Sequence, residues 1–480
     1  MPTSAIIVWF RRDLRLLDNP ALSHACQSGR PVVPVFVLED WLLAAGPEGL
    51  GAASRWWLHQ QLADLAQNLA AKGLPLILRR GPAGSVLAEL AGQCGAREVV
   101  WNRLHEPETV RQDSLTADHL HQAGLETQAF ADGLMAEPGC LLTGSETPFQ
   151  VFTPFYRKFR QTHHVAEPLA SPTSWKPFPE TLDSLDLPAL GLEPKHSWAE
   201  GLKNQWPVGE EAARQRWEKF RASGLQKYVQ QRDIPGCEGT SRLSCDLHFG
   251  AISVKHLWHQ GLRGSGAAAE DFLRQLVWRE FAHHLLHHYP HTTTENLRPS
   301  FANFAWDGDP ALLQAWQRGQ TGYPLVDAGM RQLWTTGWMH NRVRMVVASF
   351  LVKHLLLPWQ WGAAFFQETL VDYDCANNTF GWQWSAGCGA DAAPFFRIFN
   401  PTLQSRKFDP EGQYIRRWVP ELKDLPAKIL HDPASTSAGL LKNWDFELGR
   451  DYPHPVVDHK QARQRALDSY RLMRERSVSK

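Results

Sequence analysis

The chain has 480 residues, of which 43% are hydrophobic and 21% are charged, a composition that excludes a disordered protein and allows more than one core. Its 50 basic and 50 acidic residues cancel, so any binding of nucleic acid must come from a local basic patch. Seven scattered cysteines without a C-x-x-C pair favour a reducing compartment, and no apolar run has the length of a membrane span. RRDLR directly follows the first apolar run, the wrong order for a signal peptide, so we expect a cytoplasmic, monomeric protein.

The segment 1–132 alternates short apolar runs with a helical pattern. The runs are AIIVWF (5–10), VVPVFVL (32–38), PLILR (75–79) and EVVWN (98–102). Continuous apolarity is typical of parallel strands that are buried on both faces. Leucines recur at helical spacing from Leu58 to Leu69, and Gly73 can end that helix. The sequence therefore predicts a doubly wound α/β domain around a parallel sheet, although it lacks a G-x-G-x-x-G after the first strand.

Helical patterns dominate the rest of the chain. A segment rich in Pro, Ser and Leu predicts an interdomain linker that we bound at 133–205. It is followed by EEAARQRWEKFRASGL, EDFLRQLVWREFAHHLLHH and MRQLWTTGWMHNRVRMVVASFLVKHLL, with few strand-like runs. We therefore expect an all-helical domain over 206–480.

Two polar clusters each have a structural and a functional interpretation. The hydroxyls of EGTSRLS (238–244) precede a helix, where such groups usually cap the helix but can also bind phosphate. HHLLHHYPH (283–291) contains i, i+4 histidine pairs that could hold zinc. Because no further ligand is suggested, a polar helix face is the simpler interpretation, and we assign no metal.

Two further segments combine polar and aromatic side chains. On the helix WMHNRVRMVVASFLVKH, Asn341, Arg344 and Met345 share one face, whereas Arg342 points elsewhere. DYDCANNTFGWQW (372–384) holds two acids, two adjacent amides and two indoles. Such an acid can accept from an N–H of a flavin or purine, or form an ion pair with an arginine. Together these segments indicate a polar, aromatic cavity in a helical domain.

Five stretches, in order along the chain, resemble the photolyase/cryptochrome family. They are IIVWFRRDLRLLDNPAL, EGTSRLSCDLHFGAIS, QLVWREF, TGYPLVDAGMRQLWTTGWMHNRVRMVVASFLVKHL and ADAAPFFRIFNP. The second half is most similar to microbial cyclobutane pyrimidine dimer photolyases, and RWWLHQQL looks more like the class III and plant-cryptochrome branch than class I. The resemblance implies an α/β antenna domain and a helical domain that buries FAD. In such enzymes photoexcited reduced FAD lends an electron to the dimer, whose ring then splits.

The resemblance also implies a set of residues that bind FAD. Those for the phosphates, the ribityl chain and the cofactor walls are Tyr228, Thr240, Ser241, Arg242, Leu243, Ser244, Phe272 and Arg279. Arg344 would pair with Asp372 beside the isoalloxazine ring, and Asp374 would accept from a ring N–H. Asn378 would face flavin N5, where an amide is typical of repair enzymes and favours a fully reduced flavin.

Electron transfer and lesion binding are assigned in the same way. The implied electron-transfer chain consists of Trp306, Trp359 and Trp382. Trp278 and Trp384 would line the lesion pocket, and Asn341 and Met345 would touch the dimer. The implied contacts to the DNA strand are Arg232, Arg342, Arg397 and Gln404, with the arginines binding phosphates.

Gln275 departs from the family pattern E-L-x-W-R-E-F, whose glutamate donates to the thymine carbonyls. A glutamine donates through its NH2 group but cannot deliver a proton. We therefore predict weaker stabilisation of the dimer radical, by about 1–3 kcal/mol, without loss of binding. The alternatives are a cryptochrome-like photoreceptor, DNA binding without repair, and a (6-4) photolyase. The last also carries glutamine here, but the histidine pair of those enzymes is reduced to His340.

An antenna chromophore is also implied, and we favour folate over deazaflavin. His248 and Leu104 stand where deazaflavin binders place charged residues. Glu106 could hydrogen-bond a pterin, although a lone acid is more often a surface residue.

Overall fold

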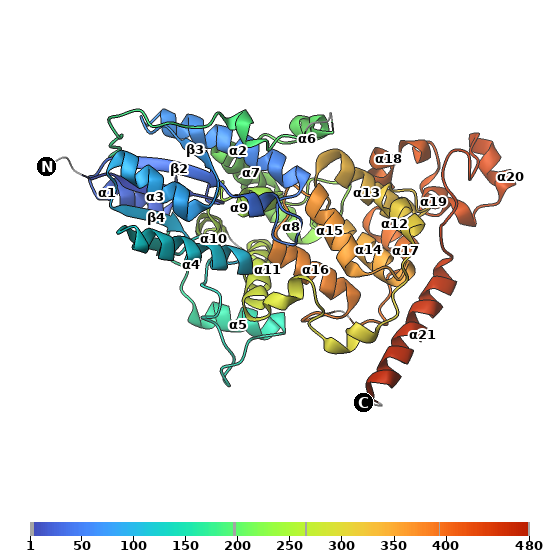
Figure 1. Cartoon of the computed structure of the whole chain (residues 1–480). Coiled ribbons are helices and arrows are strands. Elements are labelled where there is room, and N and C mark those ends of the chain that lie inside the picture. The colour runs from blue at the N-terminus through green and yellow to red at the C-terminus, as the bar shows by residue number, and fades with distance from the viewer. Residues whose placement is uncertain (1–3, 195–197, 265, 393, 479–480) are drawn as a thin grey trace. The chain divides into compact units, whose positions relative to one another are not determined.

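The computed structural model describes residues 4–194, 198–264, 266–392 and 394–478 (Figure 1). The chain separates into two compact units. Unit 1 comprises Met1–Gln226, Ser241–Pro290 and Val371–Ala376, and unit 2 comprises Lys227–Thr240, His291–Leu370 and Asn377–Lys480. Because the units interleave along the chain, they do not test the predicted domain limits at 132 and 205, which stay a prediction.

A parallel sheet forms the centre of unit 1. Its strands are β1 (Ile6–Phe10), β2 (Val32–Leu38), β3 (Ile77–Arg80), β4 (Glu98–Asn102) and β5 (Glu126–Phe130), in the order β3-β2-β1-β4-β5. Every residue of β1 and β2 is buried, which is why both read as unbroken apolar runs. The four predicted strands are confirmed. β5 was not predicted, because this edge strand, ETQAF, is half polar and mostly part-exposed.

Helices complete unit 1, and several of them pack beside this sheet (Figure 1). They are α1 (Pro20–Gln27), α2 (Ala52–Ala70), α3 (Ala83–Cys94), α4 (Pro107–Gln122), α5 (Phe152–Thr162), α6 (Ala199–Gln205), α7 (Glu210–Lys219), α9 (Ser244–His248), α10 (Val254–Leu262) and α11 (Ala267–His288). α2 confirms the predicted helix, and Gly73 follows it with a left-handed φ of 76°. Leu87 of α3 and Leu120 of α4 share one core cluster with Val35 and Val99 of the sheet.

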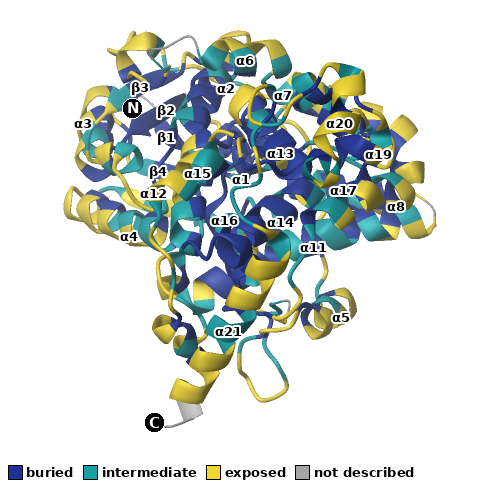
Figure 2. Cartoon of the chain, turned by 90° about the vertical axis from the view of Figure 1, so that its right-hand side faces the viewer, coloured by how far each residue is buried: buried dark blue, intermediate teal, exposed yellow. Residues whose placement is uncertain are grey.

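The described residues of unit 2 are mainly helical, as predicted. The helices are α8 (Tyr228–Gln231), α12 (Pro310–Gln317), α13 (Pro324–Thr336), α14 (Asn341–Ser349), α15 (Trp359–Thr369), α16 (Cys375–Ala386, which begins in unit 1), α17 (Pro401–Phe408), α18 (Gln413–Trp418), α19 (Ala427–Leu430), α20 (Ala438–Leu441) and α21 (His459–Val478). Gly337, with a φ of 66°, ends α13, so the long pattern forms two helices. Figure 2 shows α14 and α16 mostly buried. None of the described helices is long and apolar enough to cross a membrane.

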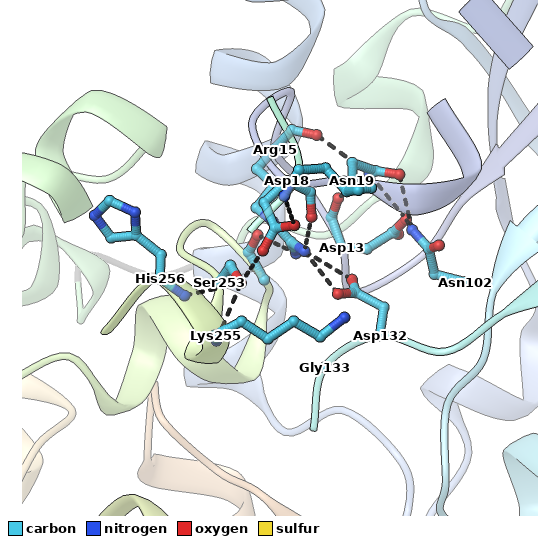
Figure 3. A network of polar contacts seen from close by, with 12 residues as sticks. Asp13, Arg15, Asp18, Asn19, Asn102, Asp132, Gly133, Ser253, Lys255 and His256 are labelled. Atoms are coloured by element: carbon cyan, nitrogen blue, oxygen red, sulfur yellow. Dashed lines mark hydrogen bonds and ion pairs between the residues drawn. The ribbon is translucent and has the colours of Figure 1, made fainter. Parts of the chain in front are cut away.

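A buried polar network follows β1 in unit 1 (Figure 3). Arg15 Nη2 donates to both carboxylate oxygens of Asp132, at 2.7 and 2.9 Å, and Arg15 Nη1 donates to the carbonyl of Gly250 at 3.1 Å. Asp18 accepts from Ser253 Oγ just before α10, and its carbonyl accepts from Arg15 at 2.6 Å. The network therefore joins the loop after β1 to the segment after β5 and to the start of α10.

Candidate cofactor, electron-transfer and lesion sites

Asp374 lies at the centre of a buried cluster in unit 1. His283 Nε2 lies 3.2 Å from Asp374 Oδ2, and His248 Nδ1 lies 3.6 Å from the same oxygen. Burial raises the pKa of Asp374, but the two histidines outweigh burial and hold the pKa well below its usual range. Asp374 is therefore a carboxylate at neutral pH and can accept a hydrogen bond from a ring N–H. Asp372 is buried as well, with 7% of its surface exposed.

The histidines of α11 differ in burial: His283 and His284 are buried, whereas His288 is part-exposed. Among the described residues, no group of three or more His, Cys, Asp or Glu is arranged to hold a metal ion. His283 contacts Asp374, and His284 Nε2 accepts from the backbone N–H of Phe149 at 3.1 Å. His287, one helical turn beyond His283, is exposed. His283 and His284 thus bind different partners, although the rings of His284 and His288 contact each other, with centroids 4.6 Å apart.

His284 is expected to make the protein sensitive to acid. Burial, followed by the charges of His288 and His287, lowers the pKa of His284 to about 3. Because the unfolded chain binds a proton near its ordinary pKa, stability is fully present above that value and is lost as the pH falls towards the folded pKa. The proton equilibrium of His284 alone should lower the free energy of unfolding by about 2 kcal/mol when the pH falls from about 7 to about 5.

Urea unfolding of the wild type and of His284→Gln at the two pH values measures this contribution. Glutamine can offer an acceptor at a similar position but has no proton equilibrium in this range. The variant should therefore lose less stability on acidification than the wild type. Equal losses in the two proteins would show that His284 does not titrate in this range.

The hydroxyl-rich run before α9 does not cap that helix. α9 begins at Ser244, and its cap position is occupied by Leu243, without a side-chain hydrogen bond to the helix. The capping interpretation is therefore wrong. Arg242 has a left-handed φ of 55°, and its guanidinium carbon lies 4.3 Å from the ring centre of Trp206. Ser244 is exposed, and Ser241 is partly exposed, so both hydroxyls can be reached by a polar ligand.

Four more residues of unit 1 that were predicted to bind FAD or the lesion lie on α11. Phe272 is buried and packs on the ring of Trp217, at 5.4 Å between centroids. Arg279 Nη1 donates to the carbonyl of Gly133 at 2.7 Å. The amide nitrogen of Gln275 donates to the carbonyl of Asp271, four residues earlier, at 3.1 Å. An amide NH2 has two N–H donors, so this bond engages one of them and leaves the other for a ligand. The fourth residue is Trp278, which is part-exposed.

In unit 2, the three tryptophans of the predicted electron-transfer chain differ in burial. Trp382 is 2% exposed, Trp359 is 0% exposed, and Trp306 is part-exposed. α15 carries Trp359 and lies directly against the Trp382 ring, because a Cβ on Gly362 would come within 2.0 Å of that ring. Trp359 Nε1 donates to Asn296 Oδ1 at 2.9 Å. Their role as an electron-transfer chain stays a prediction.

Residues at the start of α14 keep access to solvent. Asn341 is exposed, and Arg344 and Met345 are part-exposed. Arg344 Nε donates to the carbonyl of Met339 at 2.8 Å, while its predicted pairing with Asp372 joins two units and stays a prediction.

The residues of unit 2 that were predicted to contact DNA differ in their side-chain partners and in their exposure. Arg342 Nη2 lies 2.9 Å from Asp233 Oδ2, so a phosphate would compete with this carboxylate. Arg232 lies over the Tyr228 ring, with its guanidinium carbon 5.4 Å from the centroid, and Arg397 is exposed. The remaining predicted residues of this unit are all part-exposed: Thr240, Asn378, Trp384 and Gln404. Their roles stay predictions.

Unit 1 also contains a pocket that is partly open to solvent. Its walls include the aromatic rings of Trp9, Trp41 and Tyr373, together with Glu48 and Glu106. Burial raises the pKa of Glu48 to about 7, although a hydrogen bond from the backbone N–H of Glu108 opposes that shift. This pocket thus combines flat apolar walls with a carboxyl group that exchanges its proton near neutral pH.

Glu106 behaves differently from Glu48. It is 4% exposed and forms an ion pair with Arg12, so it is not the surface residue that a lone acid usually is. Burial raises the pKa of Glu106, but Arg12 and nearby histidines outweigh burial and lower the pKa to about 2. Leu104 and His248 line the same pocket.

Two family models match this chain. One, described as DNA photolyase, matches residues 6–177, and the other, described as the FAD binding domain of DNA photolyase, matches residues 272–472. The deoxyribodipyrimidine photo-lyase of Agrobacterium fabrum is 44% identical, over 99% of this chain and 99% of its own. The chain belongs to the photolyase/cryptochrome family. The match over 272–472 also supports FAD as the cofactor of this family member.

Two further relatives place it within the photolyase/cryptochrome family. A solved bacterial class III photolyase from Agrobacterium tumefaciens has a TM-score of 0.95 and 43% identity, covering 99% of this chain and 98% of that chain. Cryptochrome-2 of Arabidopsis thaliana is 36% identical over 98% of this chain and 79% of its own. The predicted resemblance, including its class III character, is confirmed.

Sequence reasoning missed α5 as a structural element of this photolyase-family fold, because its residues fall in the predicted linker. α5 contributes three fully or almost fully buried rings, Phe152, Phe155 and Phe159. Their spacing of three and four residues is an amphipathic helix signal that was present in the sequence. The ion pair between Arg12 and Glu106 had no such signal, since it joins residues 94 positions apart.

Proposed function

We propose that this protein splits cyclobutane pyrimidine dimers in DNA, in a light-driven reaction for which bound, reduced FAD supplies the electron. The observation that carries this proposal is the 44% identity, end to end, with a deoxyribodipyrimidine photo-lyase. The residues fit FAD: Asp374 is a buried carboxylate, and the hydroxyls of Ser241 and Ser244 are accessible. Free thiols at all seven cysteines are compatible with a cytoplasmic, monomeric enzyme.

The side chains of this chain would divide the work in the following way. Arg344, Asp372 and Asn378 would hold the flavin ring, with Asp374 accepting from a ring N–H. Trp278, Trp384, Asn341 and Met345 would enclose a dimer that has left the base stack. The strand would be held by Arg232, Arg342, Arg397 and Gln404. Gln275 would donate an amide N–H to a carbonyl of the dimer.

Anaerobic blue-light repair of oligonucleotides that carry one defined lesion tests this function. A cyclobutane thymine dimer should be split, and a (6-4) product should not. His340 supports the second expectation, because its ring accepts from the backbone N–H of Arg342 at 3.2 Å and caps α14. Failure to split either lesion by a protein that binds FAD would favour the alternative function, a cryptochrome-like photoreceptor.

Replacing Gln275 by glutamate should raise the repair yield. A protonated glutamate can donate an O–H to the dimer and also deliver that proton to the dimer radical anion, which a glutamine cannot do, and we expect this to stabilise the radical by about 1–3 kcal/mol. The gain should fade as the pH rises and the carboxyl group ionises. An unchanged yield at every pH would show that residue 275 does not contact the dimer carbonyls.

For the antenna, we propose a folate in the pocket of unit 1. The flat rings of Trp9, Trp41 and Tyr373 suit stacking on a pterin, and Glu48 can donate or accept near neutral pH. The apolar Leu104 in the same wall disfavours the more polar deazaflavin site. The absorption spectrum and mass of the chromophore released from purified protein identify it.

A further inference from the structure

Phe152 and Trp278 form a stacked pair of rings in unit 1. Phe152 is the first residue of α5, and Trp278 lies in α11. Their ring centroids are 3.5 Å apart, and their planes differ by 8°. Phe152 is 0% exposed, whereas Trp278 keeps partial exposure. One face of the Trp278 indole is therefore covered by a ring that comes from the segment predicted to be a linker.

The position of Phe152 is itself fixed by packing. Phe281 meets the edges of both rings, with centroids 5.8 Å from Phe152 and 5.9 Å from Trp278. The guanidinium carbon of Arg274 lies 5.2 Å from the Phe152 centroid and 5.0 Å from that of Tyr156. Fully buried rings in such packing have one rotamer, so Phe152 acts as a rigid support. Trp278 can tilt only by separating from it.

The same helix face carries Gln275. It lies three residues before Trp278 on α11, which places the two side chains next to each other. A dimer that stacks on Trp278 would therefore meet the Gln275 amide at an angle that depends on the plane of the indole. Stacking falls off when two rings are tilted, and hydrogen bonds weaken when they are bent.

We propose that Phe152 is a positioning residue that determines specificity for the lesion, because it holds the Trp278 ring in the plane that a dimer requires. This inference rests on the proposed function, in which Trp278 lines the lesion pocket. Preorganisation of this kind lowers the entropy that is lost on binding. Undamaged DNA, which leaves its bases stacked in the duplex, gains nothing from it. Phe152 thus favours damaged over undamaged DNA without touching either.

The test compares Phe152→Leu with Phe155→Leu. Phe155 is a matched control: it lies on the same helix, is 2% exposed and packs on Phe281 at 5.2 Å, but it has no ring contact with Trp278 among the described contacts. Binding is measured in the dark to a duplex with one thymine dimer and to the undamaged duplex. Phe152→Leu should weaken binding of the damaged duplex about three- to ten-fold and leave binding of the undamaged duplex unchanged. Phe155→Leu should change neither.

Two further variants, Trp278→Leu and the double variant Phe152→Leu/Trp278→Leu, distinguish the lesion role of Trp278 from the positioning role of Phe152. If Trp278→Leu leaves binding of the damaged duplex unchanged, the lesion role of Trp278 is wrong, and with it this part of the proposed function. If Trp278→Leu weakens binding but Phe152→Leu behaves like Phe155→Leu, the positioning role of Phe152 is overturned. Support requires that Phe152→Leu adds no further loss once Trp278 is leucine, because the two residues then act as one unit.

Discussion

Replacing Trp382 by phenylalanine is expected to abolish the light-driven reduction of oxidised FAD and to spare dimer repair by protein reduced chemically beforehand. The Trp382 ring is 2% exposed and lies against Gly362 of the helix that carries Trp359. Phenylalanine preserves a ring in this packing but is far harder to oxidise than an indole. Absorption spectra recorded during blue-light illumination with an external electron donor follow the reduction.

Trp316 provides the control for this experiment. Its ring centroid lies 6.2 Å from that of Trp382, it is 0% exposed, and its Nε1 donates to the carbonyl of Val347. Trp316→Phe should therefore disturb packing about as much as Trp382→Phe while leaving photoreduction in place. If photoreduction persists in Trp382→Phe and disappears in Trp316→Phe, the electron enters by Trp316 and the predicted chain is wrong.

Removing the carboxylate of Asp132 is expected to destabilise unit 1 strongly. Arg15 and Asp132 are 2% and 4% exposed, and both carboxylate oxygens of Asp132 accept from Nη2 of the arginine (Figure 3). Asp132→Ala leaves the guanidinium buried without this anion, which costs about 3–5 kcal/mol of the free energy of unfolding. Urea unfolding followed by circular dichroism measures the loss.

An exposed ion pair in the same unit serves as the reference. Arg103 and Glu137 lie 3.0 Å apart with both side chains 42% exposed, and such pairs contribute about 0–1 kcal/mol. Glu137→Ala should therefore change stability little. The contrary result is that Asp132→Ala loses no more stability than Glu137→Ala. That result would mean that water or another anion compensates the charge of Arg15, and that the buried network does not stabilise unit 1.

The sequence by itself determined the class of the fold and the chemistry of the candidate site. The strands at 6–10 and 32–38 were predictable because burial on both faces requires every residue to be apolar, which leaves an unbroken pattern. Asp374 was predictable as an acceptor because its motif is specific to a family. The hydroxyls before α9 left capping and phosphate binding open, because capping depends on where the first helical turn begins, and only the structure shows that it begins at Ser244.

Only the tertiary structure decided which distant residues meet. His248 and His283 make Asp374 a carboxylate, and their rings reach it from two helices that are far from it in sequence. Phe152 lies in a segment whose composition indicated a linker, and its stacking on Trp278 depends on the packing of α5 against α11. Local sequence fixes periodicity and residue type, whereas charge pairing and ring stacking are set by contacts between elements, so the sequence could supply these groups but not their partners.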